Sequence, residues 1–123
     1  MLLIVDAANV VGSVPDGWWR DRAGAARRLR DALAPLATTG FAGHEGPLDI
    51  ILVVEGKARG ISPIPGVRIE HSPGSGDDTI AALAAAERDR DGGVVVVTAD
   101  RGLRQRVEAV GATVVGPRSL PYP

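Results

Sequence analysis

Five acidic residues occupy positions where the strands of a parallel sheet are expected to end. Asp6 and Glu55 each follow an apolar run directly, Asp100 follows another by three residues, and Asp77 and Asp78 begin a helical segment after a short strand. Because functional sites of open α/β sheets form beyond the carboxyl ends of the strands, we expect these side chains to meet at one edge. Grouped carboxylates repel one another and require a proton or a counter-ion, and Mg²⁺ or Mn²⁺ suits such oxygen ligands.

An acidic edge of this kind suits metal-assisted hydrolysis of a phosphodiester bond. A divalent ion lowers the pKa of an attacking water and holds the phosphate oxygens. Asn9 follows Asp6 by three residues and would position a water, the metal or the phosphate. Glu55 is the weakest member of the set, since it can equally be an exposed loop residue.

Each carboxylate also has a structural explanation. An Asp after a strand often caps the next turn, which would account for Asp6. Ser75 and Asp78 have the spacing of a capping box, and Asp100 can cap a helix that begins at Arg101. The case for a site depends on convergence, because independent caps have no reason to coincide with so many strand ends.

The chain alternates between apolar strands and amphipathic helices. All-apolar runs are typical of strands that are buried on both faces, and they predict a parallel sheet covered by helices on two sides. Residues 11–17 are interpreted as a loop. We expect strands at residues 2–5, 48–54, 67–70, 93–97 and 112–115, and helices at residues 20–37, 77–90 and 101–110.

Composition narrows the class of protein. The 123 residues are 45% hydrophobic and 24% charged, with a net charge of −1, which indicates one ordinary globular domain. The absence of cysteine excludes disulfides and zinc–thiolate sites and fits a reducing compartment. The N-terminus does not resemble a signal peptide, and no apolar run is long enough to span a bilayer. We therefore expect a cytoplasmic protein without membrane contact.

Basic residues are unevenly distributed. Thirteen of the fourteen are arginine, and five of these lie between Arg20 and Arg30. Arginine binds phosphate through paired hydrogen bonds, so Arg27 and Arg28 are candidate contacts for a polymer. Lys57 and Arg59 lie beside Glu55 and could contact phosphates. A genome rich in G and C would also explain the preference for arginine over lysine. Lys57 and Arg59 could equally belong to a solvated loop without a ligand.

Two adjacent tryptophans account for half of the aromatic residues. Trp18 or Trp19 could stack on a nucleic acid base, as in single-strand binders. The alternative is that one tryptophan packs a helix onto the sheet while the other is partly exposed.

Three motifs together resemble a known family. VDAANV, SGDDTIAAL and VVVVTADRGLRQRV occur in this order, and the chain is similar over residues 2–115 to the YacP-like branch of the NYN domains, within the PIN-like nuclease superfamily. VGSVPDGWWRDR resembles the actinobacterial versions. The resemblance implies an α/β fold, a PIN-like three-layer α/β/α sandwich with a central, mainly parallel sheet of about five strands. Residues 1–116 would form this domain, and residues 117–123 a C-terminal tail.

The resemblance also implies a ribonuclease that depends on a divalent metal. Ala7 departs from the family pattern, in which glycine usually follows the first Asp. Glu55 falls where many relatives carry an acid, and Arg101 follows the last motif Asp. By this pattern the site residues are Asp6, Asn9, Asp77, Asp78, Thr98 and Asp100.

The leading hypothesis is therefore an endoribonuclease that uses Mg²⁺ or Mn²⁺. Asp6, Asp77 or Asp78, and Asp100 would bind the metal, Asn9 and Thr98 would orient water or phosphate, and Arg101 would contact phosphate or brace the carboxylates. One alternative is a non-catalytic module that binds RNA or the ribosome, and another is a hydrolase of a small phosphorylated metabolite. PIN-like proteins often form homodimers, although no apolar surface stripe demands it here.

Overall fold

The described residues form a single sheet of five parallel strands in the order β3-β2-β1-β4-β5. The computed structural model describes residues 1–58 and 60–122, with the backbone but not the side chain of Lys57. Every residue of the central strand β1 is buried. The strands are β1 (Leu2–Asp6), β2 (Asp49–Val54), β3 (Arg68–His71), β4 (Val94–Val97) and β5 (Thr113–Val115).

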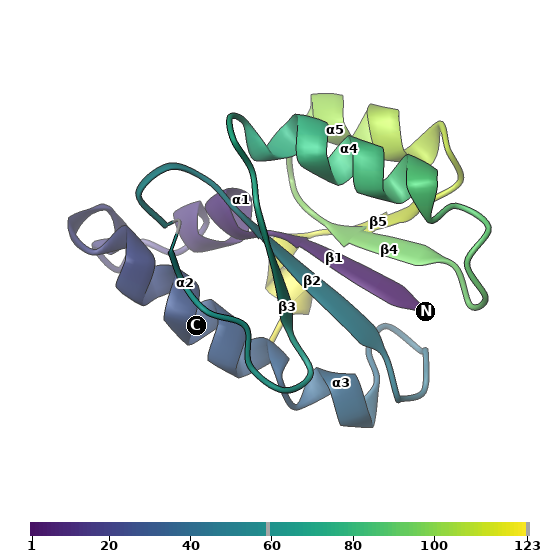
Figure 1. The fold of residues 1–123 in the computed structure, drawn as a ribbon, viewed down its shortest axis with the longest axis horizontal. Helices are drawn as coiled ribbons and strands as arrows, with labels where there is room; N and C mark the ends of the chain where they lie inside the picture. The colour runs from purple at the N-terminus through teal and green to yellow at the C-terminus, as the bar shows by residue number, and fades with distance from the viewer. Residues whose placement is uncertain (59, 123) are drawn as a thin grey trace.

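Helices cover both faces of this sheet, as expected from its apolar strands (Figure 1). Successive side chains of a strand point to opposite faces. Leu3 and Val5 of β1 accordingly belong to one core cluster, and Leu2 and Ile4 to the other. The helices are α1 (Ala7–Gly12), α2 (Arg22–Leu33) and α3 (Leu36–Thr39) over one face, and α4 (Gly76–Ala86) and α5 (Arg101–Glu108) over the other.

Strand order reverses beside β1. The chain proceeds from β1 through β2 to β3 on one side, and then crosses to β4 on the other side of β1. Such a switch point leaves a crevice beyond the carboxyl ends of the two strands, where ligands bind in open α/β sheets. The register pairs Val5 with Val97, so the residues that follow, Asp6 and Thr98, lie side by side.

Two predictions about the helices between β1 and β2 were wrong in detail. Residues 11 and 12 belong to α1 rather than to a loop, and α1 is too short at six residues to give a periodic signal. The helix expected over residues 20–37 is divided into α2 and α3 at Ala34 and Pro35. Proline lacks the N–H that a continuous helix requires.

The segment after β5 packs against the protein. Pro117–Ser119 form a 3-10 turn, and Leu120 and Tyr122 are buried in the core cluster of the α2 face. Among the described residues, no helix has both the length and the apolar character needed to cross a membrane.

Candidate active site

Asp6 ends the central strand and is the most buried carboxylate at the sheet edge, with 5% of its surface exposed. Its Oδ1 accepts a hydrogen bond of 3.3 Å from the backbone N–H of Asn9, which makes it the N-cap of α1. Its Oδ2 accepts a hydrogen bond of 3.0 Å from the Thr98 hydroxyl. Burial raises the pKa of Asp6 from 3.8 to about 6, since these bonds offset only part of the cost of removing its charge from water.

A small hydrogen-bond network joins the ends of β1 and β4. The Thr98 hydroxyl, which donates to Asp6, also accepts from the backbone N–H of Asp100 at 3.2 Å. The Asn9 Oδ1 accepts from the backbone N–H of Ala99 at 2.8 Å. Asn9 therefore holds the loop after β4, and its amide NH₂ group makes no hydrogen bond to any residue that the structure describes.

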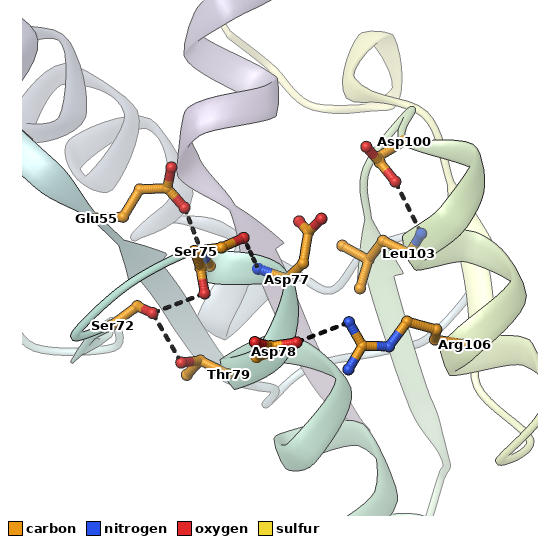
Figure 2. A network of polar contacts seen from close by, with 10 residues as sticks. Glu55, Ser72, Ser75, Asp77, Asp78, Thr79, Asp100, Leu103 and Arg106 are labelled. Carbon is orange, nitrogen blue, oxygen red and sulfur yellow. Dashed lines mark hydrogen bonds and ion pairs between the residues drawn. The ribbon is translucent and has the colours of Figure 1, made fainter.

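Glu55 and the serines before α4 anchor the start of that helix (Figure 2). The backbone N–H of Gly76 donates to Glu55 Oε2, which draws the helix toward the end of β2. Ser75 caps α4 by accepting from the backbone N–H of Asp77 at 3.2 Å. The buried hydroxyl of Ser72 donates to the Ser75 carbonyl and accepts from Thr79, both at 2.9 Å.

The two acids at the start of α4 have different environments. Asp78 forms an ion pair of 3.0 Å with Arg106 of α5, and 82% of its side chain is exposed. The Asp77 carboxylate extends into the space between Glu55 and Asp100 (Figure 2). Burial raises the pKa of Asp77, and the negative charges of Asp100 and Glu55 add to this effect. The geometry therefore favours Asp77 over Asp78 as the site residue.

Four carboxylates thus surround one open, polar hollow at the carboxyl edge of the sheet. Asp100 reaches it from the start of α5, which it caps through a 2.8 Å hydrogen bond from the Leu103 N–H. The hollow has a volume of about 320 Å³. Its lining residues are Asp6, Ala8, Asn9, Glu55, Ser75, Asp77 and Asp100.

The carboxylates line this hollow without converging on one point. Within residues 1–58 and 60–122, no three acidic or histidine side chains are close enough together to hold one ion directly, so the compact cluster expected from the sequence is not formed. The physical reason is that Asp6, Glu55 and Asp100 each accept a hydrogen bond from a backbone N–H at a helix start, which holds them apart. The donor set nevertheless suits hydrated Mg²⁺ or Mn²⁺, because such ions usually retain several waters between metal and protein.

The described arginines that were expected to contact phosphate do not line the hollow. Arg101 is exposed at the start of α5 and forms no ion pair within the described part of the chain. Arg27 and Arg28 are exposed on α2. Arg59 and the Lys57 side chain lie outside the described residues.

Sequence reasoning identified Ser75 as a helix cap but missed Ser72 and Thr79, which also position α4. Ser72 is 1% exposed and directly follows β3, so it stands at a strand end as the acids do. A serine two residues after the end of a predicted strand was the feature of the sequence that could have indicated a role for Ser72 at this edge. Its role became visible only from its bonds to Ser75 and Thr79.

The fold is similar to that of solved structures. No family model matches the chain, and no curated protein matches it in sequence. Two crystal structures of Rae1 (YacP) from Bacillus subtilis, one of them of a tryptophan-to-leucine mutant, superpose with TM-scores of 0.71 and 0.74, the latter for the mutant. Each Rae1 structure is 20% identical in sequence to this chain. The alignment covers 96% of this chain for the mutant and 97% for the other structure, and in both cases it covers 70% of the Rae1 chain. The match confirms the expected α/β fold, and it confirms the resemblance to YacP at the level of the fold.

Proposed function

We propose that the protein is an endoribonuclease of the YacP-like type, which hydrolyses RNA phosphodiester bonds at the acidic hollow with the help of Mg²⁺ or Mn²⁺. The observation that carries the proposal is the position of Asp6, a buried carboxylate at the end of the central strand beside the switch point. The shared fold with Rae1 (YacP) supports the same conclusion.

The chain's own residues would have distinct roles at this site. Asp6, Asp77, Asp100 and Glu55 surround the hollow and would hold the metal, directly or through water. When bound, the metal would lower the pKa of a water and neutralise charge on the phosphate. Asn9 uses its Oδ1 to accept from Ala99, and its amide NH₂ group makes no hydrogen bond within the described residues, so this group would donate to that water or to a phosphate oxygen.

Thr98 would act by positioning Asp6. Its hydroxyl donates to Asp6 and accepts from the Asp100 N–H, so it fixes the Asp6 side chain relative to the start of α5. Outer partners of metal ligands commonly influence affinity or activity by about 10- to 100-fold.

A second candidate function is a non-catalytic RNA-binding module on the same fold. The observation in its favour is that Asp6, Glu55 and Asp100 all serve as partners of helix N-termini. The carboxylates would then be structural, and RNA affinity would not depend on Mg²⁺.

Metal binding separates these functions. Mn²⁺ should be titrated into the protein and into the Asp6→Asn variant, followed by calorimetry and by melting temperature, with Asp31→Asn as a control for an exposed carboxylate. A specific ion at about 100 times its Kd stabilises a protein by about 2.7 kcal/mol. The proposal expects a saturable response in the protein and the control, none in Asp6→Asn, and metal-dependent RNA cleavage that Asp6→Asn abolishes.

Two outcomes would count against the nuclease. Asp6→Asn could cleave RNA at the rate of the unchanged protein, which would exclude the proposed role of Asp6. Alternatively, the protein could bind RNA equally with Mg²⁺ and with EDTA and cleave nothing, which would favour the binding module.

A further inference from the structure

A second cavity adjoins the acidic hollow. This apolar cleft has a volume of about 260 Å³ and lies among α1, α2 and the 3-10 turn at Gly56–Ala58. Ala8 and Glu55 line both the cleft and the hollow, so the two cavities share a wall. Pockets for drug-sized ligands span about 300–1,000 Å³, so the cleft suits a single ring system.

The lining of the cleft combines an aromatic ring with a planar cation. Trp18 is half-buried against the core, and the guanidinium carbon of Arg22 lies 5.2 Å from its ring centroid. Both side chains line the cleft. Aromatic rings and guanidinium planes are the surfaces on which single-stranded nucleic acids stack their bases.

The surroundings of the cleft are complementary to a polyanion. Residues 20–31 contain five arginines and two aspartates. Arg22, Arg27 and Arg28 are exposed along α2. An extended phosphate backbone that reached the hollow could therefore follow α2, whereas a neutral ligand would gain nothing from these charges.

We propose that the cleft is a subsite for one unpaired nucleobase of the RNA strand whose phosphate lies at the acidic hollow. The inference rests on the proposed function for the identity of the strand. The base would enter beside Ala8 and stack at Trp18 and Arg22, while its own backbone continues over the shared wall to the carboxylates. A paired base cannot enter a cleft of this kind without leaving its duplex, so the subsite selects single-stranded RNA.

The test measures how binding depends on the base. A fluorescein-labelled hexauridylate and a matched ribose-phosphate oligomer that lacks all six bases are titrated by anisotropy in EDTA, where no cleavage occurs. Ala58→Leu narrows the cleft without touching the hollow, and Arg22→Lys keeps the charge but removes the planar group. Ala82→Leu, at an exposed position of α4, and Arg88→Lys, at an exposed position in the turn after α4, are the matched controls outside the cleft.

The unchanged protein should bind the base-bearing oligomer roughly tenfold more tightly than the abasic one, in line with the cost of losing one stacked base. Ala58→Leu and Arg22→Lys should lose most of this preference while binding the abasic oligomer normally, and both controls should retain it. Melting temperatures verify that the variants are folded.

The experiment can refute the base subsite without refuting the proposed nuclease function, and the reverse. Equal binding of the two oligomers by the unchanged protein, or a full preference in folded Ala58→Leu and Arg22→Lys, would overturn the subsite even if RNA is cleaved. A base preference that depends on both residues, in a protein that cleaves no RNA with Mn²⁺, would support the subsite and refute the nuclease.

Discussion

Replacing Asp6 by asparagine should stabilise the metal-free protein at neutral pH. In the folded state Asp6 is 5% exposed and its pKa is about 6, compared with an ordinary value of 3.8. Burial is the main cause of this shift, and the charges of Asp77 and Glu55 contribute to it. The folded protein therefore binds the Asp6 proton more tightly than the unfolded chain does.

The sign of the effect follows from proton linkage. Between about pH 4 and pH 6 the folded state holds more protons than the unfolded state, so the free energy of unfolding falls as pH rises. Above about pH 6 the whole penalty is present, and a shift from 3.8 to about 6 corresponds to about 3 kcal/mol. Asparagine carries no charge and avoids this penalty.

The substitution should preserve the local geometry. The asparagine oxygen can still accept from the Asn9 N–H, and its NH₂ group can donate to the Thr98 hydroxyl, which serves as donor or acceptor. The Thr98 hydroxyl therefore keeps hydrogen-bond partners in the variant, although its own O–H loses the carboxylate acceptor, which offsets part of the gain by an amount that does not depend on pH.

Urea unfolding in EDTA at a series of pH values provides the measurement. The difference in free energy of unfolding between Asp6→Asn and the unchanged protein should grow by about 2 kcal/mol from about pH 4.5 to about pH 7.5, in favour of the variant. Asp31→Asn, which removes an exposed carboxylate that pairs with Arg30, should show a difference below about 1 kcal/mol. A difference for Asp6→Asn that stays constant within about 0.5 kcal/mol over this range would refute the argument that burial raises its pKa.

Three other substitutions probe the same core and edge. Thr98→Val leaves Asp6 Oδ2 without its donor and should lower the free energy of unfolding by about 1–3 kcal/mol at pH 7, whereas Thr98→Ser keeps the hydroxyl and should not. If urea unfolding shows the same stability for Thr98→Val as for the unchanged protein, the hydrogen bond to Asp6 is contradicted. Asn9→Ala releases the Ala99 N–H and should reduce RNA cleavage by about 10-fold or more while the melting temperature changes little; full activity would remove Asn9 from the site. Tyr122→Phe should leave stability unchanged or raise it by up to about 1 kcal/mol, since the buried hydroxyl lies near Arg28 but forms no hydrogen bond of good geometry within the described residues; a large loss in thermal unfolding would show that a bond to Arg28 stabilises the fold.

Much of the architecture was predictable from local pattern. Apolar runs such as Leu2–Val5 and Val94–Val97 are typical of strands that are buried on both faces, and this favours a parallel sheet with helices on each side. The position of Asp6 and Asp100 after such runs was also visible, so their common edge could be predicted. Helix α1 was not predictable from periodicity, because six residues with an Asp cap resemble a turn.

The tertiary structure decided what each acid does. Asp77 and Asp78 are adjacent in sequence and alike in chemistry, but Arg106 of α5 pairs with Asp78 while Asp77 borders the hollow. Glu55 seemed the weakest member of the site, yet its bond to the Gly76 N–H makes it a wall of both cavities.

The sequence by itself determined the kinds of residue at the carboxyl edge, because burial and chain direction are encoded in short runs. It did not determine their partners. Thr98 bonds to Asp6, and Asn9 to Ala99, only because β4 lies next to β1 in a register that pairs Val97 with Val5. Strand order and register result from how the whole chain packs its two cores, and no local pattern specifies contacts between residues about ninety positions apart.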